Sequence, residues 1–162
     1  MKEKIIDESL HSLRQEGLRF SIDILAEKLK VSKKTIYKYF STKEELAYAM
    51  YEKYYRELTK KITDVIYNNI PSKEEELLLC YFDSAGMVCT EIFNKYSLNR
   101  SVGSYALQQH RKIWNLIVPY LCENMSQEET ETYKLIVDGS YDKTISCHGD
   151  AIKVIGMLRR IK

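Results

Sequence analysis

Lysine is the residue type whose spacing in this chain points most clearly to chemistry. Six lysines lie between positions 28 and 43, and no aspartate or glutamate lies among them. They are Lys28, Lys30, Lys33, Lys34, Lys38 and Lys43. A local group of ammonium side chains commonly neutralises the phosphates of a nucleic acid. A basic but merely solvated helix face is the alternative, and charge alone does not separate the two.

Cysteine and histidine offer a weaker signal. The four cysteines, at positions 80, 89, 122 and 147, form no C-x-x-C pair, and zinc sites are built from closely spaced ligand pairs. We therefore expect small packed side chains, no metal and no other cofactor. Cys147 precedes His148 directly, but neighbours in sequence rarely face each other as nucleophile and base, so we expect no enzyme. A regulator that responds to cysteine oxidation is an open alternative.

The composition is that of a chain with a substantial core and long elements. Hydrophobic residues make up 44% and charged residues 30% of the 162 positions, with only six glycines and two prolines. No run of 18 apolar residues occurs, so no membrane-spanning helix is expected. The N-terminus carries no apolar signal segment, and we expect a cytoplasmic protein without a membrane partner.

Apolar periodicity predicts three short helices at the start of the chain, over residues 2–16, 22–29 and 33–40. Ser21 and Ser32 stand at the N-cap positions of the second and third. In the third, Ile36 and Phe40 are spaced i, i+4 and predict an anchor to the core, while lysines and tyrosines occupy the other faces. Two short helices joined by a tight turn, the second basic and aromatic, are typical of a helix-turn-helix.

Longer helices are predicted for the rest of the chain. A capping box of Thr42 and Glu45 opens a helix of about 27 residues that ends near Asn69. Capping boxes of Ser72 with Glu75 and of Ser126 with Glu129 precede two of the further helices. These helices are expected over 77–93, 99–123, 127–147 and 151–161. The predicted fold class is all-α: a three-helix head joined by the long fourth helix to a helical body. We place a DNA-binding domain at residues 1–46 and a regulatory and dimerisation domain at 47–162.

The segment SIDILAEKLKVSKKTIYKYFSTKEELAYAM, from Ser21 to Met50, resembles the DNA-binding domain of the tetracycline-repressor (TetR) family of bacterial transcription regulators. The resemblance implies a sequence-specific repressor that binds double-stranded DNA at a palindromic operator. It also implies a homodimer and a small-molecule effector that controls operator affinity. A helix-turn-helix protein without an effector is the alternative.

Positions that match the family's DNA contacts follow from this resemblance. They are Ser21, Ser32, Lys33, Lys34, Thr35, Tyr37, Lys38, Tyr39 and Lys43. The resemblance assigns phosphate contacts to Ser21 and Lys43, and base or backbone contacts to the start of the third helix. Two positions depart from the family pattern. Lys30 replaces a common turn glycine, which predicts some strain if that residue has a positive φ, and Asp23 lies where some members carry an arginine.

The body matches the family only in being helical. Candidate effector-binding residues on the expected fifth and sixth helices are Tyr81, Met87, Cys89, Tyr105, His110 and Trp114. Candidate dimer residues on the last two helices are Ile136, Tyr141, Ile145, Ile152, Ile155 and Leu158. For both groups the alternative is an ordinary role in the core of one chain.

Overall fold

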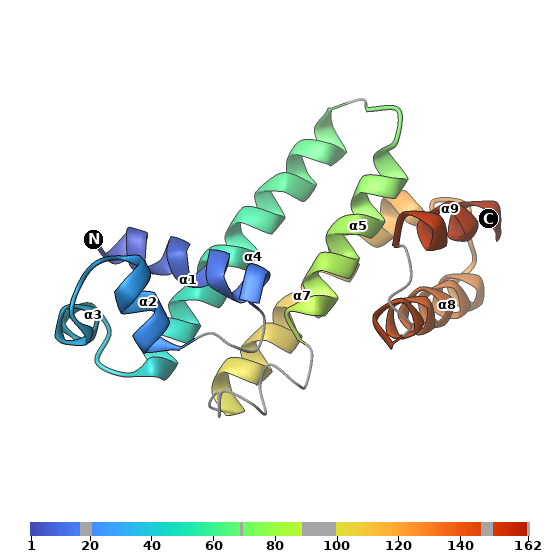
Figure 1. Cartoon of the computed structure of the whole chain (residues 1–162). Helices are drawn as coiled ribbons and strands as arrows, with labels where there is room; N and C mark the ends of the chain where they lie inside the picture. Colours follow the sequence, from blue (N-terminus) through green and yellow to red (C-terminus); the bar gives the residue numbers. More distant parts are fainter. Residues whose placement is uncertain (17–20, 69, 89–99, 147–150, 162) are drawn as a thin grey trace. The chain divides into compact units, whose positions relative to one another are not determined.

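The computed structural model describes residues 1–16, 21–68, 70–88, 100–146 and 151–161. Every regular element in these ranges is an α-helix, which confirms the predicted all-α class (Figure 1). The helices are α1 (Lys2–Glu16), α2 (Ile22–Lys28), α3 (Lys33–Tyr39), α4 (Lys43–Tyr67), α5 (Lys73–Gly86), α7 (Arg100–Leu121), α8 (Gln127–Ser146) and α9 (Ala151–Ile161). No helix in the described ranges has the length and apolar character needed to cross a bilayer.

Two of the predicted boundaries differ from those observed. Helix α4 has 25 residues and ends at Tyr67 rather than Asn69. Helix α5 starts at Lys73, directly after Ser72 of the predicted capping box, and ends at Gly86, whereas the apolar run alone predicted a helix over 77–93. An apolar run marks the buried part of a helix and misses a charged first turn such as Lys73–Glu76. Residues 89–93 of that prediction lie outside the described part.

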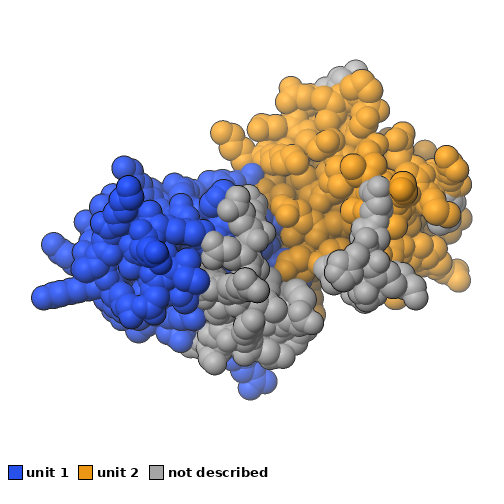
Figure 2. Space-filling model, viewed as in Figure 1, with its two compact units in different colours: residues 1–57, 87–108 blue, residues 58–86, 109–162 orange. Residues whose placement is uncertain are grey.

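The chain forms two compact units, coloured separately in Figure 2. Unit 1 comprises residues 1–57 and 87–108, and unit 2 comprises residues 58–86 and 109–162. Helices α4 and α7 therefore contribute residues to both. These units are defined by contacts within the chain. They do not test the predicted functional domains at 1–46 and 47–162, which remain a prediction.

In unit 1 the helices of the head share an apolar core supported by polar links. Helix α1 buries Ile5 and Leu10. It also buries Ser12, whose hydroxyl accepts a hydrogen bond of 3.1 Å from the Lys28 ammonium of α2. Lys53 of α4 is paired with the carboxylates of Glu3, at 3.1 Å, and Asp7 of α1. The hydrogen bond to Asp7 is the main cause that raises the pKa of Lys53.

The turn between α2 and α3 is a Schellman motif followed at once by an N-cap. The amide of Val31 donates to the carbonyl of Ala26, and the amide of Lys30 donates to Glu27, both at 3.0 Å. This pair of bonds requires a left-handed residue at Lys30, and its φ is +54°. Among the described residues other than glycine, Lys30 alone has a positive φ. The expected strain at a position usually held by glycine is therefore present.

In unit 2, helix α5 is the most buried element. Leu77 and Leu78 have no exposed surface, and Tyr81 is 1% exposed. The start of α8 confirms a capping box, because the amide of Ser126 donates to Glu129 at 2.7 Å and the amide of Glu129 donates to Ser126 Oγ at 3.3 Å. Helix α5 is thus held by its buried side chains, and the start of α8 is held by its capping box.

Replacing the strained residue should stabilise the protein. A left-handed backbone costs a non-glycine residue about 1–2 kcal/mol, and the extra chain entropy of glycine offsets about 0.5–1 kcal/mol of that. We expect Lys30→Gly to raise the free energy of unfolding by roughly 0.5–1 kcal/mol in urea titrations. The matched control is Lys38→Gly, inside α3, which should lower it by about 1 kcal/mol. A Lys30→Gly protein less stable than the parent would contradict the assignment of strain.

Candidate nucleic-acid interface

Helix α3 is seated in the head by two side chains on one of its faces. Ile36 and Phe40 are each 1% exposed. The amide of Phe40 closes the helix on the carbonyl of Ile36 at 3.0 Å. Because one face of a seven-residue helix is fixed in the core, the remaining faces must point outward.

The outward faces carry cationic and aromatic groups. Tyr37 is 46% and Tyr39 38% exposed, and Lys34 and Lys38 are exposed as well. Lys34 and Lys38 are spaced i, i+4, so they lie on one row of the helix surface. An α-helix with long polar side chains on its free faces has the width that the major groove of DNA admits.

Three hydroxyl groups among the predicted contacts already serve the local fold. Ser21 Oγ accepts from the amide of Ile24 at 3.2 Å and caps α2. Ser32 Oγ accepts from the amide of Thr35 at 3.1 Å and lies 2.9 Å from the Thr35 hydroxyl. A serine that accepts a capping bond keeps its O–H as a donor. Ser21 can therefore cap α2 and donate to a phosphate at the same time.

An ion pair joins the first turns of α2 and α3. The Lys33 ammonium contacts the Asp23 carboxylate, and both side chains are more than half exposed. An acidic side chain in the first turn of α2 suits the helix dipole, and it also repels phosphate. In the structure it also supplies an internal partner for Lys33, one of the predicted contacts.

Lys43 is the first residue of α4 and is partly exposed. The turn before it is fixed by two bonds: the amide of Glu45 donates to Thr42 Oγ1 at 3.0 Å, and the Glu45 carboxylate accepts from the amide of Ser41 at 2.7 Å. The predicted capping box is therefore present, with its return bond one residue earlier than the usual partner. Lys43 is thereby held where the chain leaves α3.

In unit 2, three of the six candidate effector residues meet. The rings of Tyr81 and His110 stack with their centroids 4.5 Å apart, and Trp114 lies 5.1 Å from Tyr81. Two residues of α8 complete the cluster. The Tyr81 hydroxyl donates to Asp138 at 2.8 Å, and Lys134 donates to Asp138 at 2.6 Å.

Burial sets the protonation states in this cluster. It lowers the pKa of His110 to about 4, so the ring is neutral near pH 7 and its Nδ1 shares a hydrogen bond of 2.9 Å with the Ser84 hydroxyl. Burial, followed by the bond to Asp138, raises the pKa of Tyr81. The sequence missed Lys134 and Asp138, although their i, i+4 spacing is a helix ion-pair signal.

The other candidate effector residues lie elsewhere. Met87 and Tyr105 belong to unit 1. The Met87 carbonyl accepts from the Tyr51 hydroxyl at 2.9 Å, and Tyr105 packs on Tyr48 with centroids 4.8 Å apart. Cys89 lies outside the described residues.

The candidate dimer residues divide by exposure. Ile136 and Ile152 are exposed, whereas Ile155 and Leu158 are buried within the chain. Tyr141 packs its ring on Phe82 with centroids 5.5 Å apart, and the side chain of Ile145 lies outside the described part. Two further apolar side chains are exposed and were not predicted from the sequence: Leu135 at 73% and Met157 at 66% exposure. Leu135 has no apolar side chain larger than glycine three or four positions away on α8.

Comparison with known proteins agrees with this geometry. Residues 5–50 match the family described as bacterial regulatory proteins, tetR family. Over 82 residues the chain is 30% identical to an uncharacterized HTH-type transcriptional regulator, YvaF, from Bacillus subtilis (strain 168). That match covers 49% of this chain and 43% of the relative, which is less than half of the relative's own length.

Solved structures extend the similarity in fold to nearly the whole chain. A TetR transcriptional regulator from Legionella pneumophila superposes with a TM-score of 0.68 at 16% identity, covering 99% of this chain and 96% of that one. A TetR-family regulator from Bordetella parapertussis 12822 gives 0.63 at 17% identity, with 97% and 93% covered. The helix-turn-helix geometry and the match at residues 5–50 agree: this part of the chain is similar to the DNA-binding part of the bacterial regulatory proteins of the tetR family.

Proposed function

We propose that this protein is a transcription regulator that binds double-stranded DNA as a homodimer at a palindromic operator and represses transcription. The observation that carries the proposal is the seating of α3, with Ile36 and Phe40 buried and the lysine and tyrosine faces exposed. One recognition helix reads only a few base pairs, so two heads on two half-sites supply the rest of the specificity.

The roles within the head are divided by position. Lys34 and Thr35, in the first turn of α3, read base edges in the major groove. Ser21, Tyr39 and Lys43 contact phosphates and fix the register on the duplex. Tyr37 and Lys38 extend the contact along the groove, and Ser32 positions Thr35 through their hydroxyl contact of 2.9 Å.

Dimerisation through α8 and α9 is supported by exposed apolar surface. Leu135, Ile152 and Met157 are each at least 60% exposed, and such side chains commonly become buried between subunits. Gly139 and Gly156 each lie four residues beyond one of them, and a Cβ at either glycine meets nothing within 4 Å. A partner helix can therefore approach these two backbones closely.

Control by a small molecule is the remaining part of the proposal. Its support is the cluster of Tyr81, His110 and Trp114, which combines aromatic rings with polar groups as ligand sites do. Helix α4 contributes residues to both units, so an effector that displaces α4 changes the separation of the two heads. The effector can lower operator affinity at most by the factor by which it binds the DNA-free conformation more tightly than the DNA-bound one.

The ion pair of Asp23 with Lys33 gives the first prediction on DNA. In Asp23→Asn, Lys33 loses its internal partner and one repulsive charge disappears, so binding to any duplex should tighten several-fold. The slope of log affinity against log salt should steepen by up to about 0.9 per chain, the value for one extra phosphate. Fluorescence anisotropy at several salt concentrations measures both. Asp64→Asn on α4 is the charge-matched control, and equal slopes for both variants would refute a phosphate role for Lys33.

The division of roles within the head predicts two kinds of variant. On operators selected from a random duplex library, Tyr39→Ala and Lys43→Ala should weaken binding to every sequence alike. Lys34→Ala and Thr35→Ala should also relax the preference at particular base pairs, where a good base contact discriminates by about 1–3 kcal/mol. Lys60→Ala, at an exposed position of α4, should leave both quantities unchanged. Uniform losses from all four variants would contradict the division.

The dimer surface gives a prediction on mass. Light scattering should report about 38 kDa in solution, twice the 19.1 kDa of one chain. The double variant Leu135→Glu, Ile152→Glu places charges on two exposed positions, so it should fold and become a monomer with weakened operator binding. Leu107→Glu, at 43% exposure on α7, is the matched control and should stay dimeric. A parent protein that is monomeric at micromolar concentration with full operator binding would overturn the assignment.

A further inference from the structure

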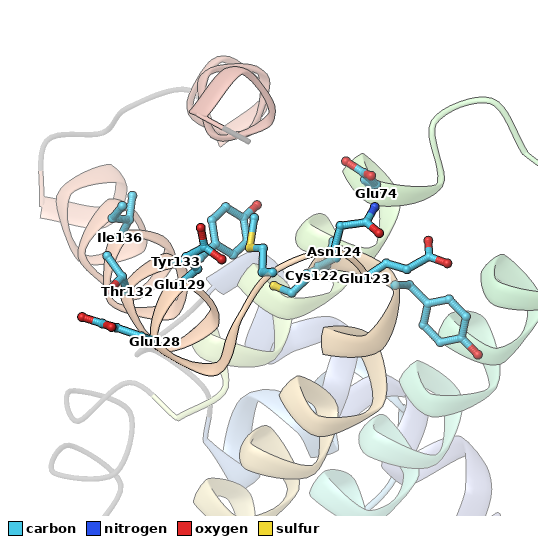
Figure 3. A pocket seen from close by; sticks show the side chains of 12 residues that line it. Glu74, Cys122, Glu123, Asn124, Glu128, Glu129, Thr132, Tyr133 and Ile136 are labelled. Carbon is cyan, nitrogen blue, oxygen red and sulfur yellow. The ribbon is translucent and has the colours of Figure 1, made fainter.

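A pocket of about 620 Å³ opens in unit 2 where α7 ends and α8 begins (Figure 3). Its wall comprises the first turn of α5, the turn that joins α7 to α8, and the first three turns of α8. None of the candidate effector residues lines it, so it is separate from the cluster around Tyr81. Its volume lies in the range of small-molecule sites.

The lining combines an apolar base with an acidic rim. Leu121, Cys122 and Tyr133 are buried and form part of the base. Four carboxylates, of Glu74, Glu123, Glu128 and Glu129, also line the pocket, and no lysine or arginine does. Figure 3 shows Glu74 and Glu123 on one side of it and the α8 glutamates on the other. The carboxylates give the pocket a negative potential beside its buried apolar side chains.

Two cationic side chains, Lys73 and Arg159, line a smaller adjoining pocket and already have partners. Lys73 donates to the carbonyl of Ile66 at 2.9 Å, and Arg159 Nη1 lies 3.4 Å from the carboxylate of Glu75. Lys73 Nζ also lies 5.8 Å from the centre of the Tyr120 ring. Tyr120 lines both pockets, and its ring therefore already accepts a cation–π contact in the folded chain.

The arrangement of the carboxylates favours an organic cation over a metal ion. Within the described ranges, which include every lining residue, no three histidine, cysteine or acidic side chains are grouped closely enough to ligate one ion. Carboxylates spread around a rim suit a positive charge distributed over a larger body. Tyrosine, methionine and cysteine side chains suit the apolar part of such a body.

We propose that this pocket binds an organic cation with an apolar body, a quaternary or protonated aryl-alkyl amine. The apolar part packs on Tyr133, Cys122 and Met125, and the ammonium group lies at the rim among the glutamates. The inference goes beyond the proposed DNA-binding function and does not depend on it. Binding is measured on the protein without DNA, so the two proposals can fail separately.

Two of the rim glutamates are suitable for substitution. The carboxylate of Glu129 caps α8 through the amide of Ser126, and Glu74 has further interactions within the chain. Glu123 and Glu128 are exposed, so glutamine at these positions should leave the fold intact. Glu131→Gln is the matched control: it removes the same charge from α8 outside the pocket lining.

The test is isothermal titration calorimetry with benzyltriethylammonium, with benzenesulfonate as the anionic and benzyl alcohol as the neutral probe. We expect the cation to bind one site per chain with a Kd below about 1 mM, and neither control probe to bind. The double variant Glu123→Gln, Glu128→Gln should weaken binding about tenfold, since each exposed charge contributes modestly. Glu131→Gln should bind like the parent.

Three results would overturn the proposal. The first is no saturable binding of the cation by the parent protein. The second is equal affinity of the parent and the Glu123, Glu128 double variant. The third is binding that appears only in the monomeric Leu135→Glu, Ile152→Glu variant, because the pocket would then be covered by a second copy in the native dimer.

Discussion

Burial of Ile36 and Phe40 is the constraint on which the function of the head depends. A helix as short as α3 is not stable alone, so its position comes from this contact and from its two ends. The Schellman turn at Lys30 and the cap at Ser32 set where α3 begins, and the bond from Phe40 to Ile36 closes it. The exposed lysines and tyrosines are therefore placed by the core, and the strain at Lys30 is a cost of that placement.

Several groups proposed to contact DNA have partners inside the free protein. Lys33 is paired with Asp23, and the Ser21 and Ser32 hydroxyls cap helices. These contacts restrict the side chains before binding, which lowers the entropy lost when a complex forms. They also oppose binding where a partner has to be given up. Ser21 avoids that loss because capping leaves its O–H available, whereas Lys33 has to exchange one anion for another.

The sequence was sufficient to predict elements and caps, but not most of the contacts between helices from different segments. Ser21, Ser32 and Ser126 were recognisable as caps because the signal is local. The strain at Lys30 was expected only if the turn has a positive φ, because the resemblance places a common glycine there. The pair of Asp23 and Lys33 depends on how α2 and α3 cross. Apolar spacing on α9 identified Ile155 and Ile152 alike, yet Ile155 is buried within the chain and Ile152 is exposed. The pocket at the α7–α8 turn draws on three segments, and no spacing along the chain indicates it.

Insertion of α3 into the major groove is tested most directly by dimethyl sulfate footprinting of a selected operator, which reports guanine N7 in the major groove and adenine N3 in the minor groove together. Two inserted helices protect N7 in two half-sites centred about one helical turn apart and leave N3 unprotected. Saturated binding that leaves every N7 reactive, or protects N3 alone, would contradict the insertion of α3 into the major groove.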